Sequence, residues 1–287
     1  MNRSRLVNLA ALASAVALAG AANAQTQAPA PAPAAAPAAA PAAAPAPADP
    51  LSFNVGVVTD YRYRAISQSR LKPALQGGAD YAFASGAYIG TWASTISWIK
   101  DAGKLVTPNV DTGSTPLEID LYGGYKGEIV KDVGYDVGGL YYLYPTNQYD
   151  NIGGTSKADT FEIYGAVTYG IFTAKYSYSL TTLFGFGGNG LPKSTGSGYL
   201  DLSAAYDAGD GWTITPHIGR QQVAKYNLVS YTDYGLTVAK DMGKGVSLSG
   251  ALIMADVKKI GGTAVYASPA GKNLGKGTVV LGAKYTF

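Results

Sequence analysis

The clearest indication of the fold is the C-terminal run Thr278-Val279-Val280-Leu281-Gly282-Ala283-Lys284-Tyr285-Thr286-Phe287. Successive side chains of a β-strand point to opposite faces, so every second residue from Val279 to Phe287 shares one apolar face. The other face carries mainly Thr, Gly and Lys. The run is as long as a strand that crosses a bilayer at a tilt, about 9–11 residues. It favours a transmembrane strand over the edge strand of a secreted β-sandwich.

The N-terminus has the features of a secretory signal peptide over residues 1–24. A basic segment with Arg3 and Arg5 precedes an apolar stretch, and Ala22-Asn23-Ala24 forms a small-residue cleavage site. No other stretch approaches the roughly 18 apolar residues of a membrane-spanning helix. After cleavage near Ala24, we expect the protein in the periplasm, outside the cell or in the outer membrane.

Residues 25–50 consist almost entirely of Ala and Pro. Such a segment has little apolar surface to bury and favours polyproline II geometry, so we expect a disordered spacer. It could contact the cell wall or serve as an inert tether. The predicted domains are therefore a signal peptide (1–24), this spacer (25–50) and a folded region (51–287).

Composition excludes several classes of protein. The chain has 22 Lys and Arg against 19 Asp and Glu, and loss of Arg3 and Arg5 leaves 20 against 19. Nucleic-acid binding requires a basic excess or stripe, so no nucleic-acid partner is expected. The chain has no Cys and a single His, which excludes disulfides, thiolate metal sites and His-rich metal sites. We expect no cofactor.

The abundance of Tyr and Gly fits a membrane barrel. The chain has 22 Tyr and 37 Gly, and its mean hydropathy is +0.04. A barrel can be that polar because half of each strand faces its interior, and aromatic residues form girdles at the two interfaces.

Period-2 runs follow one another from residue 51 to the end, and we count about twelve. The connections alternate in length: 85–86, 127–132, 170, 207–211 and 241–245 are short, whereas 64–73, 99–115, 145–157, 184–197, 222–231 and 257–276 are long. Outer-membrane barrels have short turns on one side, long loops on the other and an even number of strands. We therefore predict an all-β fold: an antiparallel up-and-down transmembrane β-barrel of about 12 strands, with no helix.

Several segments resemble the TorF family of porin-like proteobacterial outer-membrane proteins. The first is Phe53-Asn54-Val55-Gly56-Val57-Val58-Thr59-Asp60-Tyr61-Arg62-Tyr63-Arg64-Ala65-Ile66-Ser67-Gln68-Ser69, followed by Pro73–Tyr81, Gly90–Ser94, Glu118–Tyr125, Tyr231–Tyr234 and the closing strand. The resemblance implies a porin-like barrel in the outer membrane of a Gram-negative bacterium. In such barrels the terminal aromatic belongs to the signal read by the barrel assembly machinery, which implies that role for Tyr285 and Phe287.

Asp60, Arg62 and Arg64 alternate with Tyr61 and Tyr63, which we predict to face lipid. Arg or Lys on the lipid side at mid-membrane depth costs about 2–4 kcal/mol, so the charged side should face the lumen. There it could set ion selectivity, as charged rings do in pores. It could equally form salt bridges that fill and brace a narrow barrel, because twelve strands lie between filled and open barrels.

The same alternation predicts ten further charged residues in the lumen. They are Asp80, Glu118, Asp120, Asp136, Glu162, Asp201, Asp233, Lys126, Lys175 and Lys284. With Asp60, Arg62 and Arg64 included, the predicted lumen has eight acidic and five basic residues, which predicts a weak preference for cations. A one-residue slip in any strand would alter this balance.

Enzymatic activity is not expected. His217 is the one imidazole and has no Ser at a suggestive spacing, so we interpret it as structural or lumen-lining. Gly185–Gly190 matches G-x-G-x-x-G but lies in a predicted loop that opens no helix.

We therefore predict a porin-like channel in the cell outer membrane. Small polar solutes or ions would pass through a narrow, charge-lined lumen, with membrane lipid around the barrel. Two alternatives are a closed structural or adhesive barrel and, with less support, a barrel enzyme such as a phospholipase.

Overall fold

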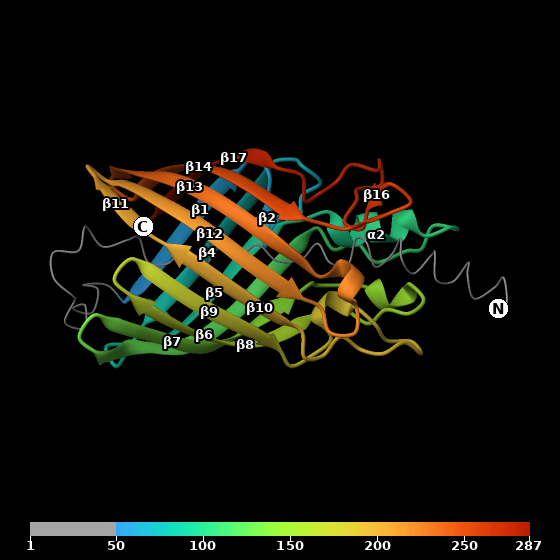
Figure 1. Ribbon diagram of the computed structural model, residues 1–287, viewed down its shortest axis with the longest axis horizontal. Helices are drawn as coiled ribbons and strands as arrows, with labels where there is room; N and C mark the ends of the chain where they lie inside the picture. The colour runs from blue at the N-terminus through green and yellow to red at the C-terminus, as the bar shows by residue number, and fades with distance from the viewer. Residues whose placement is uncertain (1–49) are drawn as a thin grey trace.

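The computed structural model describes residues 50–287. The predicted signal peptide and all but the last residue of the predicted spacer lie outside this range. Thirteen strands form one sheet in the described part (Figure 1): β1 (Leu51–Val58), β4 (Ala74–Ala82), β5 (Ala87–Thr95), β6 (Leu117–Val130), β7 (Val133–Leu143), β8 (Thr160–Tyr169), β9 (Phe172–Ser179), β10 (Gly198–Ala204), β11 (Tyr206–Gly209), β12 (Trp212–Gln222), β13 (Tyr231–Gly243), β14 (Val246–Asp256) and β17 (Thr278–Thr286).

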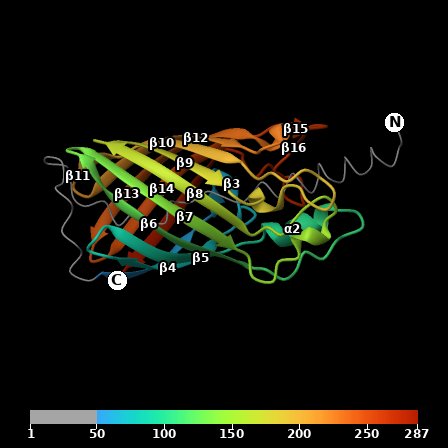
Figure 2. The same ribbon diagram turned by 90° about the horizontal axis from the view of Figure 1, so that it is seen from below.

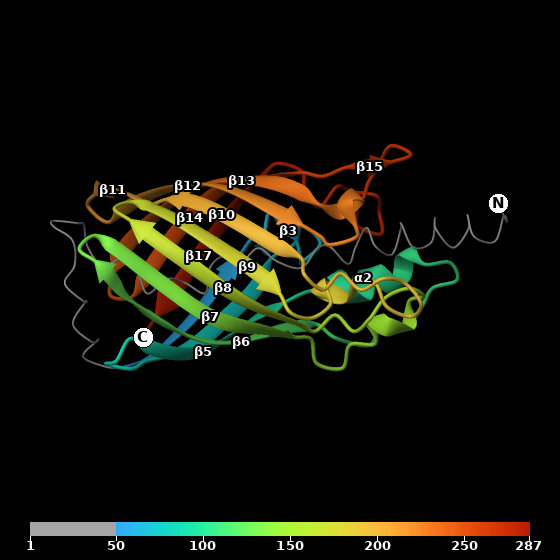
Figure 3. The ribbon, with the colours of Figure 1, turned by 60° about the horizontal axis from the view of Figure 1, so that its bottom comes forward.

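The sheet closes on itself. Apart from β10 and β11, consecutive strands of the sheet pair antiparallel, and β1 pairs with β17. Both β10 and β11 pair with β12, so they form one interrupted strand, and the described residues make a closed barrel of 12 strands. Figures 2 and 3 show the tilted strands around the barrel. The predicted fold class is confirmed.

The apolar residues of most strands point outward. In β1, Leu51, Phe53, Val55 and Val57 are exposed, whereas the alternate residues are half-buried. The last strand likewise presents Val279, Leu281, Tyr285 and Phe287 outward. Phe287 stacks on Phe53 with ring centroids 5.8 Å apart, and the backbones of these residues exchange two hydrogen bonds. The two chain ends of the barrel are thus joined at one seam.

Short and long connections lie at opposite ends of the barrel. The short ones are 83–86, 131–132, 170–171, 210–211 and 244–245, and the long ones are 59–73, 96–116, 144–159, 180–197, 223–230 and 257–277. We call the parts of the barrel near them the turn half and the loop half. This alternation agrees with the prediction from the sequence.

The long loops contain small elements of their own. These are β2 (Arg62–Tyr63), β3 (Ile66–Ser67), α2 (Trp98–Leu105), η1 (Tyr149–Asn151), η2 (Leu183–Gly185), η3 (Asn227–Val229), β15 (Lys259–Ile260) and β16 (Thr263–Ala264). No helix in residues 50–287 is long and apolar enough to cross a membrane.

The helix α2 corrects the expectation that no segment is helical. The alternation of residues 87–98 predicts a third strand that ends at Trp98, but β5 ends at Thr95 and the chain turns into the helix. Trp98, Ile99 and Ala102 lie on its buried side, so its apolar spacing follows the helical period of 3.6 residues. The helix follows closely after β5, so in the sequence its apolar residues look like a continuation of the period-2 alternation of that strand.

An outward apolar face would place Trp92 and Ile96 of this third run towards lipid, but β5 faces the other way. Its aromatic face, with Trp92 and Ile96, points into the barrel and is buried, whereas Ile89 points outward and is exposed. Trp92 contacts the ring of Tyr61 with centroids 5.4 Å apart. The interior of the loop half therefore contains an apolar core, and the most apolar face of a strand need not be its outer face.

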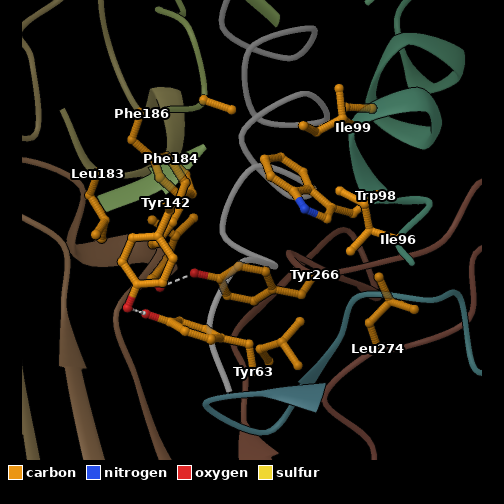
Figure 4. Close-up of a cluster of buried hydrophobic side chains, with 14 of the residues drawn as sticks. Tyr63, Ile96, Trp98, Ile99, Tyr142, Leu183, Phe184, Phe186, Tyr266 and Leu274 are labelled. Atoms are coloured by element: carbon orange, nitrogen blue, oxygen red, sulfur yellow. Dashed lines mark hydrogen bonds between the residues drawn. The ribbon is translucent and has the colours of Figure 1, made fainter. Parts of the chain in front are cut away.

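This core lies where the long loops meet the barrel interior (Figure 4). The ring of Phe184 packs edge-on against Tyr142 and Tyr63, with centroids 5.2 Å and 5.8 Å away. Trp98 packs against Tyr144 at 5.3 Å. Aromatic pairs of this geometry stabilise beyond the area that they bury, so this core stabilises the loop half.

Candidate functional site

The candidate site is the barrel interior, and its main feature is the segment 59–73. The wall strand β1 ends at Val58, and all residues from Asp60 to Ser69 are buried. They form the two-stranded β2–β3 ribbon inside the barrel, which we call the inward hairpin. Its turn residues Arg64 and Ala65 have φ of 43° and 66°. Positive φ at both positions is the backbone of the tight turns that join hairpin strands.

The position of Tyr61 and Tyr63 corrects the prediction that they face lipid. Both are 1% exposed and point into the interior. The alternation predicts one continuous wall strand, but the chain leaves the wall after Val58 and continues alternating within the hairpin. Arg62 and Arg64 accordingly lie on the inward hairpin and not on a wall strand.

Asp60 holds the base of the inward hairpin together. One carboxylate oxygen accepts hydrogen bonds from the hydroxyls of Ser67 and Ser69, at 2.5 Å and 3.2 Å. The other accepts one from Arg62 Nε at 2.8 Å. Asp60 thus acts within the hairpin, joining its two sides at the point where the chain turns inward.

Arg64 joins the tip of the hairpin to the opposite wall of the barrel. Its guanidinium donates to Glu162 on β8 at 2.8 Å and to Gln221 on β12 at 2.5 Å. It also lies over the ring of Tyr199, 4.0 Å from the centroid. In the sheet order, β8 and β12 are five and four strands away from β1. The hairpin therefore crosses the full width of the interior.

Two further contacts fasten the hairpin to the wall. The Tyr61 hydroxyl donates to Glu118 at 2.5 Å, and Tyr144 donates to the other oxygen of the same carboxylate at 2.7 Å. Burial raises the pKa of the Tyr144 phenol well above its ordinary value, and the charge of Glu118 adds to this rise. The hydroxyls of Tyr63 and Tyr142 are 2.7 Å apart and hydrogen-bonded (Figure 4).

Asp120 differs from these paired acids. It is 1% exposed, and neither carboxylate oxygen has a hydrogen-bond partner among the described residues. Its backbone lies opposite Trp92 on one side and Tyr142 on the other. Buried polar groups are usually hydrogen-bonded, so Asp120 is the least satisfied acid of the loop half.

The turn half is lined differently, by tyrosines bonded to acids. Tyr122 donates to Asp80 at 2.5 Å, and Tyr88 donates to Asp136 at 2.6 Å. The hydroxyls of Tyr88 and Tyr164 are also hydrogen-bonded to each other. These bonds join strands that are not neighbours in the sheet, which is possible only across the concave inner face.

Inward-facing glycines make room for these rings. A Cβ atom at Gly138 would lie 2.5 Å from the Tyr164 hydroxyl, and one at Gly124 would lie 2.6 Å from that of Tyr88. Both distances are shorter than a real contact allows. The rings therefore lie along the wall over the glycine backbone, which keeps them out of the centre of the lumen.

The predicted bases occupy the same half. Lys175 lies over the ring of Tyr164 at 3.9 Å, and Lys126 lies over that of Tyr88 at 5.7 Å. Lys284 lies on the inward side of β17 and is half-buried. These cations are thus interleaved with the tyrosines that bind Asp80 and Asp136.

His217 lies between two predicted lining acids. Its ring nitrogens are 3.1 Å from Asp201 and 2.7 Å from Asp233, and the Tyr199 hydroxyl donates to Asp233 at 3.1 Å. No Ser or Thr hydroxyl of the described residues hydrogen-bonds with this imidazole. This Asp-His-Asp arrangement was not predicted from the sequence, although alternation places all three residues on the inward faces of adjacent strands.

The predicted lining residues thus separate into two levels. Asp60, Arg62, Arg64, Glu118, Asp120, Glu162 and Asp233 lie in the loop half, and Asp80, Lys126, Asp136, Lys175, Asp201 and Lys284 line the middle and the turn half. Sequence reasoning missed the inward hairpin, Gln221 and the tyrosines that hold the acids in both halves.

A match to a known protein family covers the whole barrel. Residues 42–287 match the profile of a family described as bacterial protein of unknown function (Gcw_chp). The chain belongs to the Gcw_chp family. None of the curated proteins compared matches it.

Solved porins share features of shape with this Gcw_chp member. A KdgM porin has a TM-score of 0.49 and 8% identity, covering 82% of this chain and 99% of its own. A NanC porin has a TM-score of 0.49 and 11% identity, covering 82% and 98%. Pseudomonas aeruginosa OprD has a TM-score of 0.37 and 12% identity, covering 83% and 66%.

Proposed function

We propose that the protein is an outer-membrane channel through which small polar solutes or ions diffuse passively. The observation that carries this proposal is the closed barrel whose outer side is apolar and whose inner side carries charged and hydroxyl groups. In lipid, a closed barrel satisfies every backbone polar group, and alternating strands place polar side chains in the lumen. We also propose that the predicted signal peptide directs export and that the barrel assembly machinery recognises Tyr285 and Phe287. The resemblance to the TorF family supports the same proposal.

The inward hairpin makes this channel narrow. It crosses the loop half and bonds to the walls through Arg64 and Tyr61. In the turn half, the tyrosine rings lie along the wall over glycines. We infer that passage is controlled in the loop half, whereas Asp80, Asp136 and the interleaved lysines bias the charge of what passes through the turn half.

A closed structural or adhesive barrel is the second candidate. The complete burial of Asp60–Ser69 favours it, since this segment fills the loop half and reaches the far wall. For an enzyme the support is weaker. The one imidazole is hydrogen-bonded to two acids and a tyrosine, which stabilise the ring, and no Ser or Thr hydroxyl within residues 50–287 bonds to it.

Electrical recording from refolded protein in a planar bilayer tests the proposal. We expect discrete conductance steps from the native chain in potassium chloride, and larger steps from Arg64→Ala, in which the hairpin tip loses its contacts. An Arg220→Ala variant is the control, because Arg220 is exposed on the outer side of β12. If neither the native chain nor Arg64→Ala gives steps, the closed barrel is the correct description.

A further inference from the structure

A pocket of about 500 Å³ opens at the loop end, between the inward hairpin and the last long loop. It lies at the mouth of the barrel, because Arg62 belongs to the hairpin and Thr278 begins the inward side of β17. The lining residues are Arg62, Leu71, Lys272, Asn273, Lys276, Gly277 and Thr278. Pockets of about 300–1,000 Å³ are of the size that holds small molecules.

Three of these residues are cations and none is an acid. Arg62 is held rigidly, since Nη1 donates to the carbonyls of Ala65 and Lys276 at 3.0 Å and 2.9 Å, and Nε donates to Asp60. Asp60 offsets one positive charge. The pocket therefore keeps an excess of two positive charges from Lys272 and Lys276.

The two lysines are free to bind a ligand. Both are exposed, and neither ammonium group makes a hydrogen bond or ion pair within residues 50–287. By contrast, Lys258 in the same loop donates to a backbone carbonyl at 2.6 Å. The Asn273 carbonyl oxygen accepts from the Gly275 backbone at 2.9 Å, which leaves its amide NH₂ as a neutral donor.

We propose that this pocket binds a small organic anion, a solute with a carboxylate or phosphate group and the size of a monosaccharide. The lysines would supply charge-assisted hydrogen bonds to the anion, Asn273 and Thr278 would bind its hydroxyls, and Leu71 would contact its apolar side. The role of this pocket as a capture site at the mouth of the channel rests on the proposed function. The binding itself requires only the folded barrel.

The position of the pocket favours a dissolved solute over a lipid headgroup as the source of the anion. A lipid phosphate would approach from the outer surface of the wall, whereas Arg62 and Thr278 belong to the inner side. A dissolved solute and a lipid headgroup can carry the same anionic group, so the experiment also tests competition by an anionic lipid.

Calorimetric titration of the processed full chain in neutral detergent tests the proposal. We expect glucose 6-phosphate to bind and glucose to give no heat. Lys272→Gln with Lys276→Gln should weaken binding at least about tenfold, because charged hydrogen bonds are lost. Arg62 is left intact because it holds the hairpin. The matched control is Lys244→Gln with Lys259→Gln, which also removes two positive charges. Lys244 lies in a turn at the other end of the barrel, and Lys259 lies in the last long loop but does not line the pocket.

Equal binding of glucose, or an equal loss in the control pair, would overturn the proposal. Competition by phosphatidylglycerol micelles, with no competition from neutral micelles, would assign the pocket to lipid and reject the solute. Heat-dependent mobility on gels verifies that each variant is folded. Binding without conductance steps would refute the channel alone, and steps without binding would refute the capture site alone.

Discussion

The guanidinium of Arg64 and the carboxylate of Glu162 meet in a two-point contact inside the barrel, with Nη2–Oε2 at 2.8 Å and Nη1–Oε1 at 3.4 Å. Their side chains are 6% and 2% exposed. The Arg64 guanidinium also contacts the rings of Tyr199 and Tyr63, 4.0 Å and 4.9 Å from their centroids. This pair ties the tip of the inward hairpin to the wall, so it is the contact most relevant to opening the loop half.

Loss of Arg64 should release the hairpin. In Arg64→Met, the buried Glu162 loses its counter-charge, and breaking such a pair costs about 3–5 kcal/mol. We expect larger conductance steps and a lower unfolding temperature. The double variant Arg64→Met with Glu162→Met should recover most of the stability, because an apolar pair of similar volume is often neutral. A double variant as unstable as the single one would contradict this account.

Removal of the hydroxyls that hold Glu118 should destabilise the barrel. Tyr61→Phe and Tyr144→Phe each remove a donor to a buried carboxylate, and hydrogen bonds to charged groups contribute about 1.5–3 kcal/mol. Denaturant unfolding in detergent measures the loss. Tyr135→Phe serves as the control, since the Tyr135 hydroxyl makes no hydrogen bond within residues 50–287. If Tyr135→Phe is equally harmful, the effect does not come from Glu118.

The space over inward glycines should be needed for the tyrosine rings. A Cβ at Gly138 would lie 2.5 Å from the Tyr164 hydroxyl and 2.6 Å from the Gly123 carbonyl oxygen. Gly138→Ala should therefore cost about 1–3 kcal/mol of unfolding free energy, as overpacking does. Gly134→Ala on the same strand meets nothing closer than 3.7 Å and should be tolerated. Equal effects of the two variants would show that strand propensity, not ring packing, is responsible.

The acids of the turn half should bias the channel towards cations. Asp80→Asn with Asp136→Asn removes two negative charges while keeping acceptors for Tyr122 and Tyr88. In a potassium chloride gradient, the reversal potential should move towards the value for chloride, because lining charges set the local ion concentration. Asp132→Asn, an exposed turn residue, should leave it unchanged. An unmoved potential in the double variant would place these acids outside the path.

The closing aromatic should matter for assembly more than for the folded barrel. Phe287 contacts the outer side of the seam through its stack with Phe53. Deletion of Phe287 should lower the amount of heat-modifiable protein in the outer membrane of cells, whereas refolding of the purified chain in detergent should persist. Normal amounts in cells would contradict a role in recognition by the assembly machinery.

Local alternation was sufficient to predict the barrel. The period-2 alternation and the short connections between longer ones are local features of the sequence, and they predicted the 12 strands of the barrel. Alternation is the same for a wall strand and for a ribbon inside the barrel, however. It could not show that the chain leaves the wall after Val58.

The contents of the lumen depended on contacts between residues far apart in the chain. Arg64 meets Glu162 and Gln221, which are 98 and 157 positions away, and these partners exist only once the barrel has closed. The aromatic face of β5 also points inward, where Trp92 packs against Tyr61 of the hairpin. Register and closure, which are tertiary properties, therefore determined which charges pair with each other and which remain free to meet a solute.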